Sequence, residues 1–324
     1  MFDPSSLQPN PINHNIDLAD PEGSEAFLRA GAVDYNGWWM FGAPASVIEN
    51  IGYPMPCFIR GDDMEFGLRI KNSGLQTVPI PGIGVWHEPF YLKLGGWQFY
   101  FEVRNRLAMA ALHSHGDFQG IRKDFRRVFS RDIGMCRYHS CKLMIEAMRA
   151  YLDGPEIALD TTDGPLLAAV AIVAEYGPEQ VTEVGHAPSK AEDRRQRGEL
   201  RRMLDTARES AERRVGKVAL VGQLARRMVV PEHASRKPEK VVRSNDLRPH
   251  VVAGYDRYIV IEEHGGQAWR FQRDRALEKS LWSEFLELSK RVDFDARYLE
   301  QFEATDRFAD SWREIFNLTD VGHD

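Results

Sequence analysis

The chain has 324 residues, of which 43% are apolar and 10% aromatic, so it can build a sizeable core in one large domain or two ordinary ones despite a net charge of -6. Its three cysteines, Cys57, Cys136 and Cys141, are too few for a disulfide framework or a Cys-rich zinc site, and we expect free thiols. The longest apolar run, residues 165–174, is far shorter than the roughly twenty residues that span a bilayer, so we expect no integral membrane protein.

The charge is unevenly distributed along the chain. Residues 186–250 carry 17 Lys and Arg against 9 Asp and Glu, which makes this segment +8 and the rest of the chain -14. A basic segment can meet anionic lipid, nucleic acid or a phosphorylated substrate. Acids and bases alternate in it, which favours a solvated helix with ion pairs. We keep an anionic membrane surface as an optional partner and expect no nucleic acid.

Residues 33–87 show an alternation of strand and helix patterns. In chain order they predict an aromatic strand, two helices and two short strands, over residues 38–41, 45–51, 62–73, 76–80 and 83–87. Gly74 lies where a glycine that ends a helix is expected. The pattern is typical of an α/β layer, although it is too short for a complete doubly wound domain.

From residue 97 onward the apolar residues recur at helical spacing. They predict helices over residues 97–113, 118–129, 138–152, 165–175, 190–214, 277–292 and 296–316. A basic stretch punctuated by prolines, residues 231–250, predicts a linker or mobile loop, and residues 258–262 predict one isolated strand. The fold class is therefore expected to be α/β, followed by a mostly α-helical part.

Three carboxylates, Asp62, Asp63 and Glu65, lie where a loop is predicted to become a helix. In one interpretation Asp62 caps this helix by accepting hydrogen bonds from its first N–H groups. In the other, one carboxylate is a general base toward a hydroxyl, typically worth about a hundredfold to ten-thousandfold in rate, and a second holds that acceptor. Glycoside hydrolysis is disfavoured, because its two carboxyl groups usually come from separate elements.

His87 and the consecutive Trp38 and Trp39 are the other candidates for chemistry. His87 ends a predicted strand, where sites tend to lie in open α/β sheets, and its imidazole suits a manganese or zinc ion. A hydrogen-bonded structural histidine is the commoner role. Neighbouring residues on a strand face opposite sides, so one indole could line a cleft and stack on a sugar, whereas core packing is its usual role. A metal-dependent hydrolase ranks last, because no second histidine lies at ligand spacing.

Four segments together resemble one known family. They are Asn36-Gly37-Trp38-Trp39, the run from Phe58 to Arg69, Val85-Trp86-His87 and Arg104-Asn105-Arg106. In this order they are similar to the polymerising galactofuranosyltransferases of actinobacterial cell walls, which are inverting family 2 glycosyltransferases with a GT-A core. The resemblance implies that residues 1–115 are the acceptor-binding half of a GT-A core. It also implies that residues 116–324 are a helical C-terminal domain with a basic linker around 231–250.

The resemblance also implies roles for individual residues. Asp63 would be the catalytic base, and His87 would be a ligand of a divalent metal, Mn²⁺ or Mg²⁺, on the donor diphosphate. The implied substrate-binding residues are Trp38, Trp39, Asp62, Glu65 and Phe90. The donor would be UDP-galactofuranose, and the acceptor would be a galactan chain linked to a polyprenyl diphosphate lipid.

The sequence departs from the family before the Trp pair. The family has a β-rich domain and an Asp-x-Asp metal motif there, which this sequence does not show, and we interpret Asp293-Phe294-Asp295 as a chance match. We therefore expect the donor-binding half to be absent from this chain, and the chain alone to have little or no activity. A separate donor-binding chain and a homo-oligomer are both options. The alternative function is a non-catalytic glycan-binding or assembly module. We expect a cytoplasmic location, with the inner face of the plasma membrane as an option.

Overall fold

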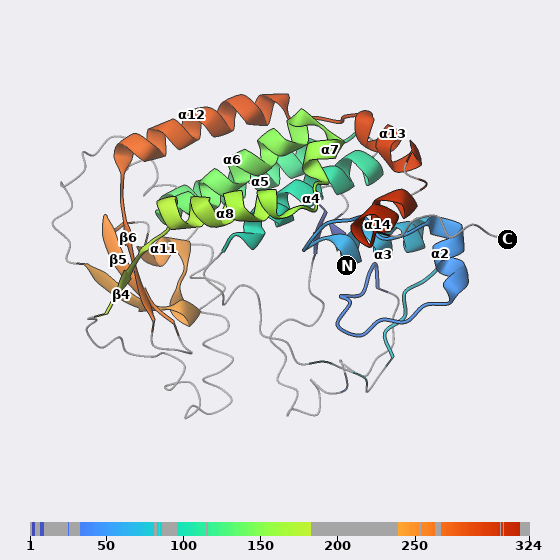
Figure 1. Ribbon diagram of the computed structural model, residues 1–324. Helices are drawn as coiled ribbons and strands as arrows, with labels where there is room; N and C mark the ends of the chain where they lie inside the picture. Colours follow the sequence, from blue (N-terminus) through green and yellow to red (C-terminus); the bar gives the residue numbers. More distant parts are fainter. Residues whose placement is uncertain are drawn as a thin grey trace.

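The structure is a computed structural model that describes residues 2–3, 7–9, 25, 33–80, 83, 85, 96–114, 116–182, 239–252, 254–262, 267–304, 306 and 308–317. Its long helices form one body, with a small sheet at one end and the acid-bearing helix α3 at the other (Figure 1). The structure is thus a mixture of helix and sheet, as expected, with helix predominating.

The helices are α2 (Ala45–Ile51), α3 (Asp62–Asn72), α4 (Gln98–His113), α5 (Gln119–Gly134), α6 (Tyr138–Asp153), α7 (Pro155–Ala158), α8 (Asp163–Tyr176), α11 (Pro249–Val252), α12 (Arg275–Arg291), α13 (Arg297–Ala304) and α14 (Ala309–Ile315). The strands are β1 (Phe2–Asp3), β2 (Gln8–Pro9), β3 (Glu179–Val181), β4 (Lys240–Arg243), β5 (Arg257–Ile261) and β6 (Ala268–Gln272), and Ser244–Asp246 form a 3₁₀ helix. No helix among these described residues is long and apolar enough to cross a membrane.

The helical body is built around α4 and α6, which share the most extensive contact between helices. Helix α4 is buried along most of its length, whereas α5 buries one apolar face that includes Phe125 and Phe129. Phe129 stacks on Phe285 of α12 with ring centroids 4.1 Å apart. The same buried cluster contains Met55 and Phe308, so the core is continuous across residue 115. The proposed functional division at residue 115 stays a prediction.

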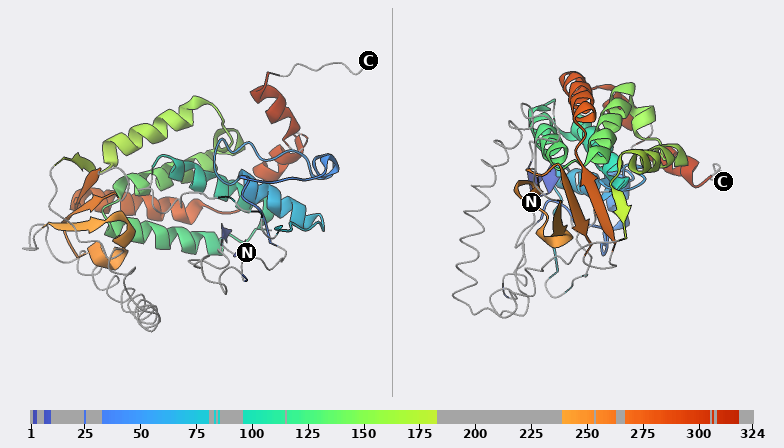
Figure 2. Two further views of the ribbon diagram at one scale, coloured as in Figure 1. Left: turned by 90° about the horizontal axis from the view of Figure 1, so that it is seen from below. Right: turned by 90° about the vertical axis from the view of Figure 1, so that its left-hand side faces the viewer.

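The small sheet has the strand order β3-β6-β5-β4, with β4 and β5 parallel and the other pairs antiparallel. Figure 2 shows these strands side by side at one end of the helical body. The Tyr258 hydroxyl of β5 donates a hydrogen bond to the Met135 carbonyl between α5 and α6, which fixes the sheet on the helices. The strand predicted as isolated is therefore a central strand. Residues 240–250 of the predicted linker form β4, a 3₁₀ helix and the start of α11.

Most of the predicted helices are confirmed to within a few residues at their start, namely α2, α3, α4, α5, α6, α8 and α12. The predicted helix over 190–214 lies outside the described residues. The single helix predicted over 296–316 is wrong: α13 and α14 are separated by a turn in which Asp306 and Phe308 have positive φ. Gly74 ends α3 as expected, with φ 86° and its N–H donated to the Lys71 carbonyl at 3.1 Å.

The short strands predicted in the first part are mostly not formed. Residues 38–41 make a turn and a bend, because the Trp39 N–H donates to the Gly37 carbonyl at 2.8 Å. In the segment 76–80 the structure has one antiparallel bridge, between Val33 and Thr77. The predicted strand 83–87 lies mainly outside the described residues. The structure therefore supports a mixed α/β class, and a GT-A core remains a proposal.

Candidate functional site

The loop that leads into α3 is held by two side chains of α4. The amide nitrogen of Asn105 lies 3.0, 2.9 and 2.6 Å from three carbonyl oxygens of this loop, those of Cys57, Ile59 and Arg60, and its two N–H groups share their hydrogen bonds among them. Arg104 donates to the Cys57 carbonyl at 3.1 Å and to the Asn105 side-chain oxygen at 3.0 Å. Arg104 and Asn105 are both fully buried, and the Asn105 amide is the donor to the Ile59 and Arg60 carbonyls, whereas the Cys57 carbonyl also accepts the Ile59 N–H at 2.8 Å. We call this arrangement the Asn105 clamp.

The clamped loop has an unusual backbone. Phe58, Arg60 and Gly61 have φ values of 63°, 69° and 94°, in a region that side chains other than glycine rarely adopt. Each such non-glycine residue costs on the order of 1–3 kcal/mol, and persists only where its surroundings impose it. Here the Asn105 clamp imposes this backbone conformation. The clamp thereby sets the residue at which α3 begins.

Helix α3 begins without a side-chain cap. Its N-cap residue is Gly61, whose carbonyl accepts the Glu65 N–H at 2.8 Å, and no side chain bonds to the first turn as a cap. The interpretation of Asp62 as the capping residue is therefore wrong: the left-handed Gly61 ends the loop one residue earlier, and Asp62 is already the first residue of the helix. Its carboxylate remains beside that of Asp63.

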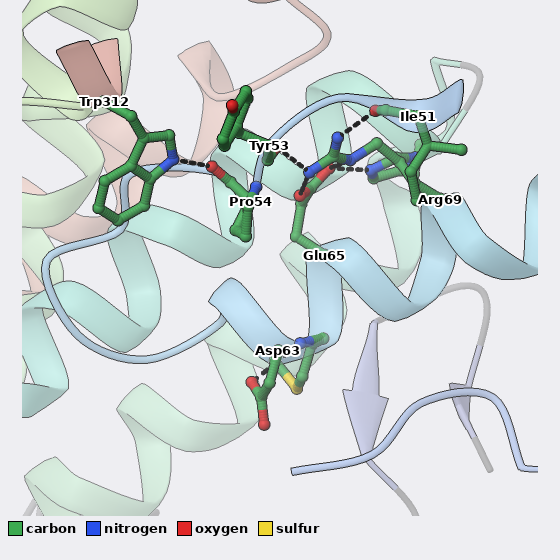
Figure 3. A network of polar contacts seen from close by, with 9 residues as sticks. Ile51, Tyr53, Pro54, Asp63, Glu65, Arg69 and Trp312 are labelled. Carbon is green, nitrogen blue, oxygen red and sulfur yellow. Dashed lines mark hydrogen bonds and ion pairs between the residues drawn. The ribbon is translucent and has the colours of Figure 1, made fainter. Parts of the chain in front are cut away.

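Asp63 is half-buried at the start of α3, and one of its carboxylate oxygens accepts the Met64 N–H at 2.8 Å. Burial and the adjacent charge of Asp62 raise the pKa of Asp63 to about 6, although this N–H and the charge of Arg60 act in the opposite direction. Figure 3 shows Asp63 pointing away from the Glu65–Arg69 pair, on the other side of α3. A carboxyl group with a pKa near the pH of the cell is suited to accept a proton from a substrate.

Glu65 has a different environment from Asp63. It is fully buried, and its two oxygens accept hydrogen bonds from Arg69 at 2.8 and 2.7 Å, while His113 Nε2 lies 3.0 Å from one of them. Burial alone raises the pKa of Glu65, but the hydrogen bond with His113 and the charge of Arg69 outweigh it and lower the pKa. Both oxygens are used inside the protein, which argues against the predicted contact of Glu65 with a substrate.

Arg69 extends this internal network to the segment between α2 and α3. Its guanidinium donates to the Ile51 and Tyr53 carbonyls at 2.5 and 2.6 Å (Figure 3). Trp312 of α14 donates from Nε1 to the next carbonyl, that of Pro54, at 2.7 Å. Glu65 and Arg69 therefore join α3 to the end of α2, and we infer that their role is to hold this part of the fold together.

The segment with the two tryptophans lies along α3, because Gly67 lets it approach closely. A Cβ atom at Gly67 would lie 2.3 Å from the Cβ atom of Tyr35. The Trp38 ring packs edge-on against Phe66 of α3, with centroids 5.6 Å apart. Trp39 is 55% exposed. The two indoles therefore differ: Trp38 packs on the helix, and Trp39 has the more open surface for a ligand.

Tyr35, at the start of this aromatic segment, lies near the predicted base. Burial and the charge of Asp63 raise the pKa of Tyr35 to about 12. Trp38 packs further along α3, on Phe66, one turn from Asp63. Two other predicted residues, His87 and Phe90, lie outside the described residues.

Two polar residues of this region were not assigned a role from the sequence. Asn105 was recognised only as part of a motif, although a buried asparagine in a largely apolar helix indicates a specific hydrogen-bond partner. His113 has no such signal in the sequence. Among the described residues, no group of three His, Cys, Asp or Glu side chains is arranged to hold a metal ion. Asp293 and Asp295 form ion pairs with Arg122 and Arg297, and the interpretation of Asp293-Phe294-Asp295 as a chance match stays a prediction.

Comparison with known proteins identifies relatives for most of the chain. It is 31% identical over 269 residues to galactofuranosyltransferase GlfT2 of Mycolicibacterium smegmatis, an alignment that covers 80% of this chain and 40% of that protein. It is 36% identical over 138 residues to galactofuranosyltransferase GlfT2 of Mycobacterium tuberculosis, covering 41% of this chain and 22% of that protein. No protein-family model matches the chain.

The chain is therefore homologous to galactofuranosyltransferases, as the sequence motifs indicated. It spans about 40% of the length of the relative from Mycolicibacterium smegmatis.

The Asn105 clamp predicts a large effect of a small substitution. Asn105→Asp replaces the donor by a carboxylate that faces carbonyl oxygens, so we expect the free energy of unfolding to fall by about 2–4 kcal/mol. Asn72→Asp, at an exposed position on α3, is the matched control and should change it by less than about 0.5 kcal/mol. Urea denaturation measures both. Equal stability of the two variants would contradict the clamp.

The close approach at Gly67 predicts a second effect. Gly67→Ala should destabilise the protein by about 1–3 kcal/mol, because the new methyl group overlaps Tyr35 and outweighs the better helix propensity of alanine. Gly42→Ala is the control, since its Cβ atom would meet nothing within 4 Å. Thermal unfolding and tryptophan fluorescence measure the change. If both variants behave like the wild type, residues 35–39 do not lie on α3 as described.

Proposed function

We propose that this chain forms the acceptor side of an inverting galactofuranosyltransferase, with Asp63 as its general base. One observation carries the proposal: the carboxyl group of Asp63 is half-buried and its pKa is raised to about 6. Asp63 belongs to a chain that is homologous to galactofuranosyltransferases. Asp63 and Glu65 lie two residues apart on one helix, yet only Asp63 points away from the internal ion pairs (Figure 3).

In the proposed reaction, Asp63 takes the proton of an acceptor hydroxyl as that oxygen attacks the anomeric carbon of the donor sugar. The bond between the sugar and the diphosphate breaks in the same step, and UDP leaves from the opposite face. Asp62 has two roles in the proposal: its charge raises the pKa of Asp63, and its carboxylate accepts a hydrogen bond from the acceptor. The Asn105 clamp keeps both acids in place during the reaction.

The proposed donor is UDP-galactofuranose, and the proposed acceptor is a galactan chain linked to a polyprenyl diphosphate lipid. The names of the relatives support galactofuranosyl transfer. The exposure of Trp39 supports its contact with a sugar ring of the acceptor, next to Trp38. Phe90 is proposed as a further acceptor contact. We also propose a GT-A arrangement for residues 1–115 and a helical C-terminal domain for residues 116–324.

Donor binding is proposed to require protein outside this chain, in the same polypeptide or in a separate one. The alignment supports this, because the chain spans about 40% of the length of the relative from Mycolicibacterium smegmatis. A divalent metal, Mn²⁺ or Mg²⁺, with His87 as one ligand, is part of the proposal; when bound, it supplies positive charge to the departing diphosphate. The described residues, which do not include His87, contain no group of three His, Cys, Asp or Glu side chains that could hold it.

A peripheral position on an anionic membrane is proposed from the basic segment 186–250, most of which lies outside the described residues. The residues to neutralise in a test are Arg213, Arg214, Arg226 and Arg227. Loss of binding to anionic liposomes in that variant would support the membrane contact, and unchanged binding would argue against it.

Removal of the proposed base tests the assignment. In a chimaera in which this chain replaces the matched region of GlfT2 from Mycolicibacterium smegmatis, Asp63→Asn should lower kcat at least about a hundredfold, because the amide cannot take the proton. The KM for the acceptor should change little. Glu49→Gln, on the exposed side of α2, is the charge-matched control. Near-normal turnover of the Asp63→Asn chimaera would refute the base assignment.

The activity of the isolated chain tests whether donor binding requires protein outside it. With UDP-galactofuranose and a lipid-linked galactan, the isolated chain should show little or no turnover while it still binds galactan. Turnover by the isolated chain would refute the need for outside protein and leave the base assignment intact. Binding of galactan by an inactive chimaera would favour the glycan-binding module instead.

The raised pKa of Asp63 predicts the pH dependence of the rate. The base acts only when ionised, so kcat/KM of the chimaera should fall about tenfold per pH unit below pH 6. Asp62→Asn removes a neighbouring negative charge that raises this pKa, so the fall should begin at a lower pH. The measurement is a pH–rate profile of both proteins. An identical acidic limb in the two profiles would contradict the coupling of Asp62 and Asp63.

A further inference from the structure

Phe58 combines two features that do not favour stability. Its φ of 63° places a bulky residue in the left-handed region, and its side chain is 42% exposed. The backbone conformation costs on the order of 1–3 kcal/mol, and the exposed part of the ring gains nothing from burial. A glycine at this position would avoid the strain. Backbone strain of this kind is concentrated at functional sites, which is a reason to look for a function of the Phe58 ring beyond packing.

The Phe58 ring is held rigidly on α4. It stacks on Phe101, which is fully buried, with ring centroids 4.9 Å apart and an interplanar angle of 29°. Trp97 lies just before α4. Its ring centroid is 6.5 Å from that of Phe58, and it packs edge-on against Phe101 with ring centroids 5.9 Å apart. Phe58 and Trp97 therefore form a partly exposed aromatic surface on a fully buried support. A surface fixed in this way loses little conformational entropy when a ligand binds.

The same hydrogen bonds position this ring and the proposed base. Asn105 binds the carbonyls on both sides of Phe58, those of Cys57 and Ile59, as well as that of Arg60 just before α3. Phe58 precedes Asp63 by five residues in the same clamped loop. A ligand that reaches Asp63 thus meets a site whose aromatic and acidic groups cannot move independently.

We propose that Phe58, supported by Trp97, binds a sugar ring of the acceptor chain, as a contact additional to Trp38 and Trp39. The inference rests on the proposed function, because it takes the acceptor to be a chain of several sugars. The C–H face of a sugar ring packs on an aromatic face without needing a charged partner. Arg104, the cation that lies over Phe101, is fully buried and so is not available to the diphosphate of a donor or of a lipid.

The test separates binding from stability. In the full chain, Phe58→Gly keeps the left-handed backbone without strain and removes the ring. We expect its affinity for a synthetic galactofuranose oligosaccharide to fall about tenfold or more, while its unfolding midpoint in urea stays close to that of the wild type. Phe58→Tyr keeps the ring and should bind within about twofold of the wild type. Titration calorimetry measures the affinities.

Phe294→Gly is the matched control, since Phe294 is a phenylalanine of similar exposure, 41%, between α12 and α13. It should bind the oligosaccharide like the wild type. Equal binding by wild type and Phe58→Gly would overturn the inference alone. A Phe58→Gly chain that loses stability together with affinity would indicate a structural role and would also overturn it. A wild-type chain that binds no oligosaccharide would overturn the proposed acceptor function itself, and with it this inference.

Discussion

The hydrogen bonds from the Asn105 amide are the interaction on which the candidate site depends. They hold three carbonyl groups of one loop near a single side chain, in a loop whose Phe58 and Arg60 have left-handed backbone. Asn105 belongs to α4, the helix at the centre of the core, and is fully buried. The loop therefore has the rigidity of the core, although it carries the groups proposed to meet a substrate.

Two acids of one helical turn receive opposite roles from their surroundings. Residues two positions apart on an α-helix point about 200° apart, so Asp63 and Glu65 face different environments. Glu65 faces Arg69 and His113, and its lowered pKa keeps it charged as part of the scaffold. Asp63 is half-buried beside Asp62, and its raised pKa suits it to the proposed role of general base. The residue type sets neither role, and the environment sets both.

The sequence predicts the parts of this fold that depend on local pattern. Helix α5 is predicted because Phe125 and Phe129 recur on one face, and α3 because acids precede an amphipathic run. The strand over 38–41 fails because its aromatic composition, typical of strands, is outweighed by the packing of Trp38 on Phe66 of α3. Strand β5 is predicted from its own composition, but its place in a sheet is not, because β4 lies in the stretch expected to be a linker and β6 is not predicted. The motif around Asp63 indicates where the candidate site lies. It does not indicate which of the acids is buried.

The Asn105 clamp could not be derived from the sequence, because its partners lie more than forty residues earlier in the chain. The pKa of Asp63, whose position the clamped loop sets, can be measured directly. Carbon-detected NMR follows the titration of its carboxyl group, and the loss of the signal in Asp63→Asn assigns it. The account predicts a midpoint near pH 6, raised by burial and by Asp62. A midpoint near 4, the ordinary range for aspartate, would contradict it and remove the physical basis for Asp63 as the base.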